Sequence, residues 1–164
     1  MTTKPDYTDE EWATLRRAPM VAGMALTLAD PGGPIEATKE TLATLRTLRD
    51  PGAVNAESEL TTDVAQDVEA LAKERKSPLG DFKPRGALAG QEILEELQRA
   101  NAILTDKAAP DEVAAFRRWV VGAAQASANA AKEGGFMGFG AERVSEGEKE
   151  MLEKVTEAVG AAGE

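Results

Sequence analysis

Carboxylates are the reactive side chains that this sequence supplies in quantity. Its 164 residues include 29 Asp and Glu but no His and no Cys. Disulfides, thiolate nucleophiles, Cys or His zinc sites and Ser-His-Asp triads are therefore excluded. Acid–base catalysis by carboxylates alone needs two of them to converge in a cleft with separated pKa values. Any enzymatic chemistry of this chain would have to rest on such a pair.

The spacing of the acids argues against a catalytic pair. Glu92 and Glu95, like Glu150 and Glu153, are three residues apart and share a helix face. Adjacent acids such as Glu95 and Glu96 diverge around a helix, and a di-iron bundle would need Glu-x-x-His motifs. The acids are thus dispersed over helix surfaces. We expect a non-enzymatic protein, with a Mg²⁺-dependent hydrolase that uses carboxylates alone as the alternative.

A glycine-rich stretch between two expected helices carries Phe136, Met137 and Phe139. It follows a helix rather than a strand and lacks the Gly-Lys-Ser/Thr of a phosphate loop, so it does not match a nucleotide site. Its apolar side chains either fold back as a plug over the core or form an exposed contact for a partner. We expect the plug, with Phe136 better buried because it follows the helix end directly.

The elements that must position these residues are helices. Aromatic residues make up only 4% of the chain, and apolar residues recur at i, i+3, i+4, i+7 spacing. Capping boxes at Thr8–Glu11 and Ser145–Glu148 mark helix starts, Pro110 opens a further helix, and Pro19 predicts a kink or a fresh start. Breakers lie at 30–34, 50–52, 75–86 and 134–135. We expect an all-α fold: a compact bundle of six to seven helices forming one domain over residues 1–164, with residues 1–7 and 160–164 flexible.

A short motif recurs in three of the expected helices. It reads Glu-x-Leu-x-x-Leu at 40–45 and 92–97, and Glu-x-Leu-x-x-Val at 150–155. Another helix precedes each copy, so the pattern predicts three helical hairpins, over residues 20–49, 63–104 and 113–159. Chance similarity among helices rich in Ala, Glu and Leu is the alternative explanation.

The first interhelical connector resembles a known family. Ala29-Asp30, followed by two glycines and Ile35, is similar to the helix-opening turn of the TerB-like family of tellurite-resistance domains. That turn has Ala-Asp-Gly, then Ile or Val, then a Glu four residues later. The segment 144–148 resembles the second half of another such turn. This chain departs from the pattern by two extra residues before Ile35 and by Lys39 in place of the Glu.

The resemblance implies a metal site. In this sequence the corresponding ligands are Asp30 with Glu36 or Glu40, whose oxygens suit a hard cation such as Ca²⁺ or Mg²⁺. The alternative is that Asp30 ends one helix and Glu36 lies in the first turn of the next, where the helix dipole favours acids. The resemblance also implies an all-helical stress-response module.

Charge and hydropathy limit the classes of partner that this chain can have. The formal net charge of −10 argues against a nucleic-acid binder, and no apolar run is long enough for a membrane span or a secretory signal, so we expect a cytoplasmic protein. Between Lys73 and Arg85 basic residues outnumber acids, which indicates a solvated connector or a small patch for an anionic partner. Our leading hypothesis is a non-enzymatic cytoplasmic binding or stress-response module, with a protein partner left open. A self-associating structural protein, hence a homo-oligomer, is a further alternative.

Overall fold

The computed structural model describes residues 1–29, 41, 44–132 and 145–161, and all regular structure in these ranges is helical. Three short 3₁₀ turns lie next to the described helices. They are η1 (Lys4–Asp6), η2 (Pro51–Val54) and η3 (Gly86–Leu88). Residues 44–49 are also helical. The remaining helices are α1 (Asp9–Ala29), α3 (Glu59–Lys73), α4 (Ala89–Lys107), α5 (Pro110–Lys132) and α6 (Glu146–Ala158). The predicted all-α fold is confirmed.

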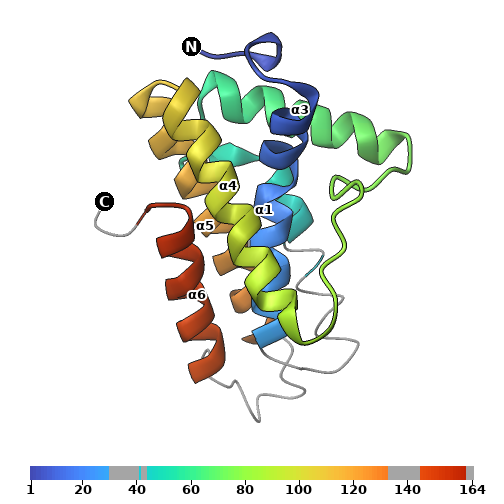
Figure 1. Cartoon of the computed structure of the whole chain (residues 1–164), viewed down its shortest axis with the longest axis vertical. Coiled ribbons are helices and arrows are strands. Elements are labelled where there is room, and N and C mark those ends of the chain that lie inside the picture. Colours follow the sequence, from blue (N-terminus) through green and yellow to red (C-terminus); the bar gives the residue numbers. More distant parts are fainter. Residues whose placement is uncertain (30–40, 42–43, 133–144, 162–164) are drawn as a thin grey trace.

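The helices form a compact bundle around α1. Helices α1, α4, α5 and α6 run roughly along the long axis of the molecule, and α3 lies across the end near the N-terminus (Figure 1). Helix α1 contacts each of α3, α4, α5 and α6, and its most extensive interface is with α5. A helix that meets four others needs apolar or small residues around most of its circumference, and ten residues of α1 are buried.

Two tryptophans anchor the core. Trp119 is fully buried and meets Phe116 edge to face, with ring centroids 5.5 Å apart. Its indole N–H donates to the carbonyl oxygen of Thr47 over 2.7 Å. The N–H of Trp12 donates to the carboxylate of Asp67 over 3.2 Å. Each buried indole therefore has the hydrogen-bond partner that its polar nitrogen requires.

Local capping signals set the helix starts. The backbone N–H of Thr8 donates to Glu11 over 2.7 Å, and that of Ser145 donates to Glu148 over 2.7 Å, so both predicted capping boxes are confirmed. Ser58 caps α3 in the same manner. Helix α5 begins at Pro110 as expected. These starts depend on residues within four positions of one another, which is why they can be seen in the sequence.

Helix α1 runs unbroken through Pro19, so the predicted fresh start at this residue is wrong. Proline in a helix interior lacks the N–H that would bond four residues back and crowds the preceding turn. Pro19 is itself buried, and its neighbours Ala18 and Val21 are fully buried in the core. Packing on both sides of the proline therefore outweighs the lost hydrogen bond.

The three-hairpin expectation fails in its second unit. Helix α3 packs on α1 and α5, whereas α4 packs on α1 and α6, so α3 and α4 do not form a closed hairpin. Helices α5 and α6 do pack on each other. The fifteen-residue stretch 74–88 carries the chain from the end of the bundle where α3 lies to the opposite end, where α4 begins (Figure 1). The recurring motif therefore does not correspond to a recurring tertiary unit.

Residues 1–7 lie against the bundle through hydrogen bonds and a ring contact. Thr2 donates two hydrogen bonds to the carboxylate of Glu112 at the start of α5, from its backbone N–H over 3.0 Å and from its hydroxyl over 2.9 Å. The ring of Tyr7 is buried and tilts against Trp12 at 5.7 Å between centroids. A buried carboxylate that needs donors gives this segment a fixed place.

Candidate functional site

The C-terminal half of α1 presents an apolar face to solvent. Met20, Met24 and Leu28 are spaced by four residues and therefore lie one above the other. Both methionines are partly exposed, and Leu28 is 52% exposed, an unusual value for a leucine beside a well-packed core. Large apolar side chains left in water at one place are a feature of binding surfaces.

Gly23 forms the floor beside this face. A Cβ at Gly23 would lie 2.5 Å from the hydroxyl of Thr44, so the helical turn 44–49 crosses α1 at closer range than any other residue would allow. The carbonyl oxygen of Gly23 also accepts a hydrogen bond from Ser127 of α5 over 3.3 Å. Three helical segments thus meet at one glycine, and Thr44 is buried there.

Above this crossing lies an open pocket with a cavity volume of about 140 Å³. Apolar atoms dominate its wall, with Thr27, Thr41 and Thr44 adding hydroxyl groups at the margin. Thioether side chains such as those of Met20 and Met24 are flexible and polarisable, so they adapt to ligands of different shape. A dry cavity of about 150 Å³ is large enough for a benzene-sized group. We call this site the α1 pocket.

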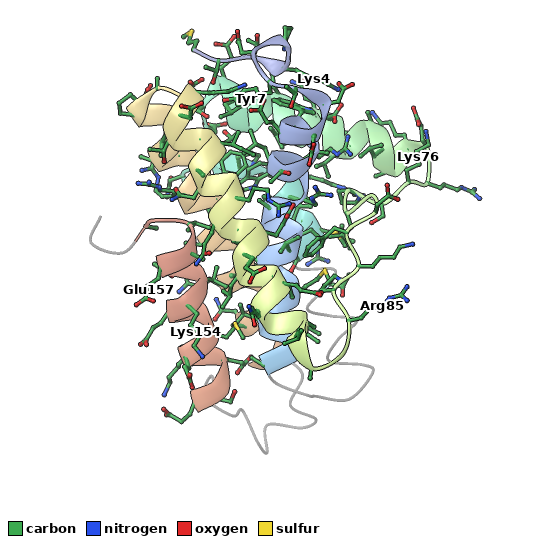
Figure 2. All side chains as sticks on the ribbon, in the orientation of Figure 1. Lys4, Tyr7, Lys76, Arg85, Lys154 and Glu157 are labelled. Atoms are coloured by element: carbon green, nitrogen blue, oxygen red, sulfur yellow. The ribbon has the colours of Figure 1, made fainter. Side chains whose placement is uncertain are left out.

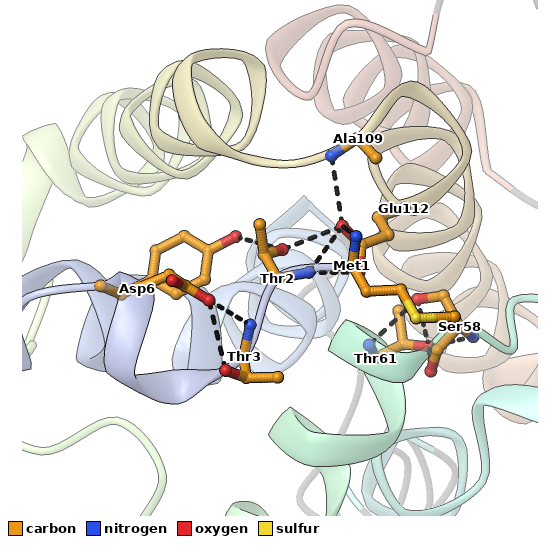
Figure 3. Close-up of polar contacts among 9 residues, drawn as sticks. Met1, Thr2, Thr3, Asp6, Ser58, Thr61, Ala109 and Glu112 are labelled. Carbon is orange, nitrogen blue, oxygen red and sulfur yellow. Dashed lines mark hydrogen bonds and ion pairs between the residues drawn. The ribbon is translucent and has the colours of Figure 1, made fainter.

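The buried carboxylates serve structural roles elsewhere. Figure 3 shows Glu112 at the centre of a cluster in which Thr2 and the backbone N–H of Ala109 donate to it, the latter over 3.2 Å. Only 3% of the Glu112 side chain is exposed. Glu148, also buried, accepts from the backbone of Ser145. These acids hold helix starts and the N-terminal segment in place.

A buried ion pair joins α1 to α4. The guanidinium of Arg17 donates to Glu96 over 2.6 Å, and their side chains are 14% and 3% exposed. Arg99 reaches the second oxygen of Glu96 over 3.1 Å from the outside. Arg17 also donates to the carbonyl oxygen of Leu79 over 3.4 Å and lies 5.7 Å from the ring of Phe82. This arginine therefore holds both α4 and the 74–88 stretch against α1.

Asp67 of α3 is the most heavily bonded of the partly exposed acids. It accepts hydrogen bonds from Lys4 at 3.0 Å, Arg16 at 3.1 Å and Trp12 at 3.2 Å. Burial by itself raises the pKa of the Asp67 carboxyl, but the donors from Lys4, Arg16 and Trp12 outweigh it, so the pKa lies below its usual range. Asp67 thereby connects η1, α1 and α3.

Of the acid pairs singled out in the sequence, Glu92 and Glu95 line one open surface pocket, but each accepts a hydrogen bond from a protein donor. Glu92 accepts from the backbone N–H of Arg85, and Glu150 pairs with Lys154 over 2.6 Å. Glu95 accepts from the side chain of Gln91 on its own helix. Within the described ranges, no three acidic side chains lie close enough to hold a metal ion.

Two of the predicted sites cannot be placed on this framework. Asp30, Glu36 and Glu40, the candidate metal ligands, lie outside the described residues. So do Phe136, Met137 and Phe139 of the glycine-rich stretch. Both predictions therefore stay predictions.

The α1 pocket was not anticipated from the sequence. Met24 and Leu28 belong to the apolar stripe that helical spacing assigns to the core. The spacing of apolar residues predicts which residues share a helix face, but it does not predict whether another helix covers that face. One signal for the pocket was present in the sequence: Met20 and Met24 flank Gly23 in the same helix. A glycine inside a helix indicates close packing at that point, and methionine side chains are flexible and apolar.

Comparison of the chain with protein-family models, with curated proteins and with solved structures finds no significant match. Among the described helices, none combines the length and the apolar character needed to cross a membrane. The function must therefore be argued from the geometry of this molecule.

Proposed function

We propose that this protein is a non-enzymatic binding module whose α1 pocket accepts one apolar side chain of a partner protein. The observation that carries the proposal is an open apolar pocket of about 140 Å³ on a helix fixed by four neighbours. Interfaces between proteins commonly centre on a few side chains that fill such pockets, surrounded by contacts of smaller energy.

The size of the pocket favours a single side chain over a larger ligand. Sites for cofactors and drug-sized molecules measure roughly 300–1,000 Å³, about two to seven times the volume found here. A single leucine, methionine or phenylalanine side chain matches the pocket better. Burying one such side chain contributes about 1.5–3 kcal/mol, so it acts as an anchor and the rest of the partner must add further contacts.

The use made of the buried acids supports a binding role over catalysis. Glu96, Glu112 and Glu148 are all buried, and each receives donors from the framework of the fold. A general acid or base needs a carboxyl that faces substrate and exchanges its proton during the reaction. Carboxylates committed to helix starts and to a buried arginine are suited to holding the bundle together.

Methionine methyl groups provide a direct test. We expect the Met20 and Met24 ε-methyl resonances to shift on titration with N-acetyl-leucinamide, with a dissociation constant roughly in the millimolar range. Met151 of α6 serves as the internal reference. Met24→Gln should remove the shift at Met20, whereas Met151→Gln should leave it intact. Equal shifts at all methionines, or none at Met20 and Met24, would contradict the proposal.

The metal-binding part of the sequence hypothesis has its own test. If Asp30 and Glu36 or Glu40 hold Ca²⁺ or Mg²⁺, the ion should raise the melting temperature of the wild-type protein and leave that of Asp30→Asn unchanged. A melting temperature of the wild type that does not respond to either ion would remove this part of the hypothesis. The apolar pocket does not depend on it.

A further inference from the structure

The stretch between α3 and α4 carries an unusual concentration of positive charge for so acidic a chain. Five basic residues stand between Lys73 and Arg85, against the two acids Glu74 and Asp81, while the whole chain has a net charge of −10. We call residues 73–88 the basic connector. It leaves the end of α3 and runs along the outside of the bundle to the start of α4 (Figure 1).

Three of these cations have no partner within the part of the chain that the structure describes. Lys73 pairs with Glu69, and Lys76 pairs with Glu74. The side chains of Arg75, Lys83 and Arg85 are exposed and form neither an ion pair nor a hydrogen bond with a described residue. Outside the connector, Arg46 and Arg49 are the other described basic side chains that are exposed and have no such partner. Figure 2 shows Lys76 and Arg85 pointing away from the bundle.

Arg75 occupies a backbone position that favours glycine. Helix α3 ends in a Schellman motif, in which the N–H of Lys76 bonds the carbonyl of Leu71 over 2.9 Å and the N–H of Arg75 bonds that of Ala72 over 3.0 Å. The φ of Arg75 is +57°, in the left-handed region. Glycine adopts it without cost, whereas a side chain with a Cβ destabilises it.

The helix dipole does not explain the choice of arginine at this position. A cation near the C-terminal end of α3 is favourable, but Lys73 and Lys76 already supply positive charge there without a left-handed backbone. Among the described residues, the other non-glycine residue with positive φ is Asn55, whose side chain tolerates this conformation. Only the backbone hydrogen bonds of the Schellman motif, which glycine would form equally well, offset the conformational cost at Arg75. Its side chain forms no ion pair or hydrogen bond with a described residue, a pattern typical of functional positions.

Contacts with α1 and α4 hold the backbone of the connector against the bundle. Arg17 donates to the carbonyl oxygen of Leu79, and its guanidinium lies over the ring of Phe82 at 5.7 Å. Near its end, the N–H of Arg85 donates to Glu92 over 3.3 Å. Pro78 is buried and Pro84 half-buried. These contacts fix the backbone while the cationic side chains stay outside, which lowers the entropy lost when a ligand binds.

We propose that the basic connector binds a short acidic segment of a partner protein, through Arg75, Lys83 and Arg85. The inference names the partner chemistry that the proposed function leaves open. The inference rests on the proposed function in one respect only, namely that the connector and the α1 pocket bind the same partner. Arg17, which contacts the connector, precedes Met24 by seven residues on one side of α1, a rise of about 10 Å. A short peptide spans that distance in about three residues.

The charge of the whole molecule favours a short peptide over an extended polyanion. Electrostatic interactions between exposed charges extend over about 8–10 Å at physiological ionic strength. A nucleic acid or an anionic membrane would bring its negative charge close to the surrounding acidic surface, which repels it. A short peptide has only a few carboxylates to place near the connector, although Glu92, Glu95 and Glu96 line the same pocket as Lys83.

Charge reversal with a matched control tests the connector. We expect capped hexaglutamate to shift the amide resonances of Arg75, Lys83 and Arg85, and hexaglutamine to leave them unchanged. The double variant Lys83→Glu/Arg85→Glu should raise the dissociation constant about tenfold. Arg46→Glu/Arg49→Glu alters the net charge equally and should change it less than about twofold. An equal loss in both variants would show that only the overall charge matters and would overturn the proposal.

The left-handed position offers a second, independent test. Arg75→Gly should raise the melting temperature by about 2–4 °C while weakening hexaglutamate binding about threefold. Arg75→Ala should weaken binding equally without the rise in melting temperature. Unchanged peptide binding in both variants would overturn the role of Arg75. Tighter binding of a single-stranded oligothymidylate of equal charge would overturn the choice of a peptide.

The two proposals can fail separately. Hexaglutamate has no apolar side chain, so its binding reports on the connector alone. A peptide with one added leucine should in addition shift the Met20 and Met24 methyl groups. Connector shifts without methyl shifts would remove the α1 pocket and leave the connector site standing, whereas methyl shifts without connector shifts would overturn the present inference.

Discussion

Asp67 shows how much one partly exposed side chain organises. Its carboxylate receives hydrogen bonds from Lys4, Trp12 and Arg16. The Nε atom of Arg16 beside it is buried without a partner in the described structure. Removing the Asp67 carboxylate would also leave the Trp12 indole N–H and a second guanidinium nitrogen of Arg16 without a hydrogen-bond partner. At the scale of single residues, stability therefore depends on acids that satisfy several donors at once.

Asp67→Asn should lower the free energy of unfolding at pH 7 by about 1–2 kcal/mol, because a neutral amide accepts weaker hydrogen bonds from two cations. The pKa of Asp67 is lowered on folding, so its contribution is present above about pH 4 and is lost as the pH falls through the folded value. The difference from wild type should thus shrink in acid. Asp63→Asn, on the same helix, is the control. Urea titrations at pH 7 and pH 3 measure both; a difference that is constant with pH would contradict the assignment.

The buried pair of Arg17 and Glu96 predicts a different response. Arg17→Met should cost about 2–4 kcal/mol, because it leaves a buried carboxylate with only the exposed Arg99. Arg17→Met/Glu96→Leu should recover most of this loss, since an apolar pair of similar volume needs no counter-ion. Arg99→Ala should cost no more than about 1 kcal/mol. Chemical denaturation of the wild type, Arg17→Met, Glu96→Leu and the double variant gives the coupling, and additive losses would refute it.

At the scale of elements, Gly23 sets the distance between α1 and the helical turn 44–49. Alanine is favoured over glycine in a helix by about 1 kcal/mol, yet a Cβ at Gly23 would overlap the Thr44 side chain. At Gly90, by contrast, the nearest atom is the Met151 methyl at 3.9 Å. The same substitution should therefore have opposite effects at the two glycines.

Gly23→Ala should destabilise the fold by about 1–3 kcal/mol, the usual cost of overpacking, while Gly90→Ala should be neutral or stabilising. Gly23→Ala/Thr44→Ala should be more stable than the sum of the single changes implies, because the closest contacts of the new Cβ are to the Thr44 side chain. Thermal and urea unfolding of Gly23→Ala, Thr44→Ala, the double variant and Gly90→Ala measure this. An additive double variant would mean that the two segments do not meet as described.

Helix type and helix starts could be predicted from the sequence because they depend on near neighbours. Thr8, Ser145 and Pro110 each act within one turn, and all three predictions are confirmed. Of the two alternatives predicted at Pro19, the fresh start is wrong because the packing that keeps α1 continuous comes from distant segments. The α1 pocket was missed for the same reason, since the burial of Met24 and the exposure of Leu28 depend on which helices lie over α1.

At the scale of the whole molecule, the absence of His and Cys makes the charge constant around neutral pH. Asp67 contributes to stability above about pH 4, as argued above. Burial, with the charges of nearby acids, raises the pKa of Tyr7 on folding against the lowering effect of the Thr2 hydrogen bond. Its contribution is therefore present below about pH 10 and is lost as the pH rises through the folded value. Between these limits neither group changes protonation.

The free energy of unfolding should accordingly vary by less than about 0.5 kcal/mol between pH 6 and pH 9, apart from any effect of a terminal amine. It should fall below about pH 4 as Asp67 and other bonded carboxylates are protonated. Urea unfolding at constant ionic strength across this range provides the measurement. A slope near neutrality larger than a terminal amine accounts for would contradict this expectation.

The pairing of α1 with α5 also governs how the chain is made. Ser127 bonds Gly23 across 104 positions, and Thr2 bonds Glu112 across 110. At synthesis rates of about 5–20 residues per second, α1 waits roughly 5–20 s on the ribosome before its main partner emerges. During that interval the apolar circumference of α1 has no cover from α5. Assembly of the bundle therefore waits until α5 has been synthesised, and in that interval the acidic surface of the nascent chain or chaperones must limit aggregation.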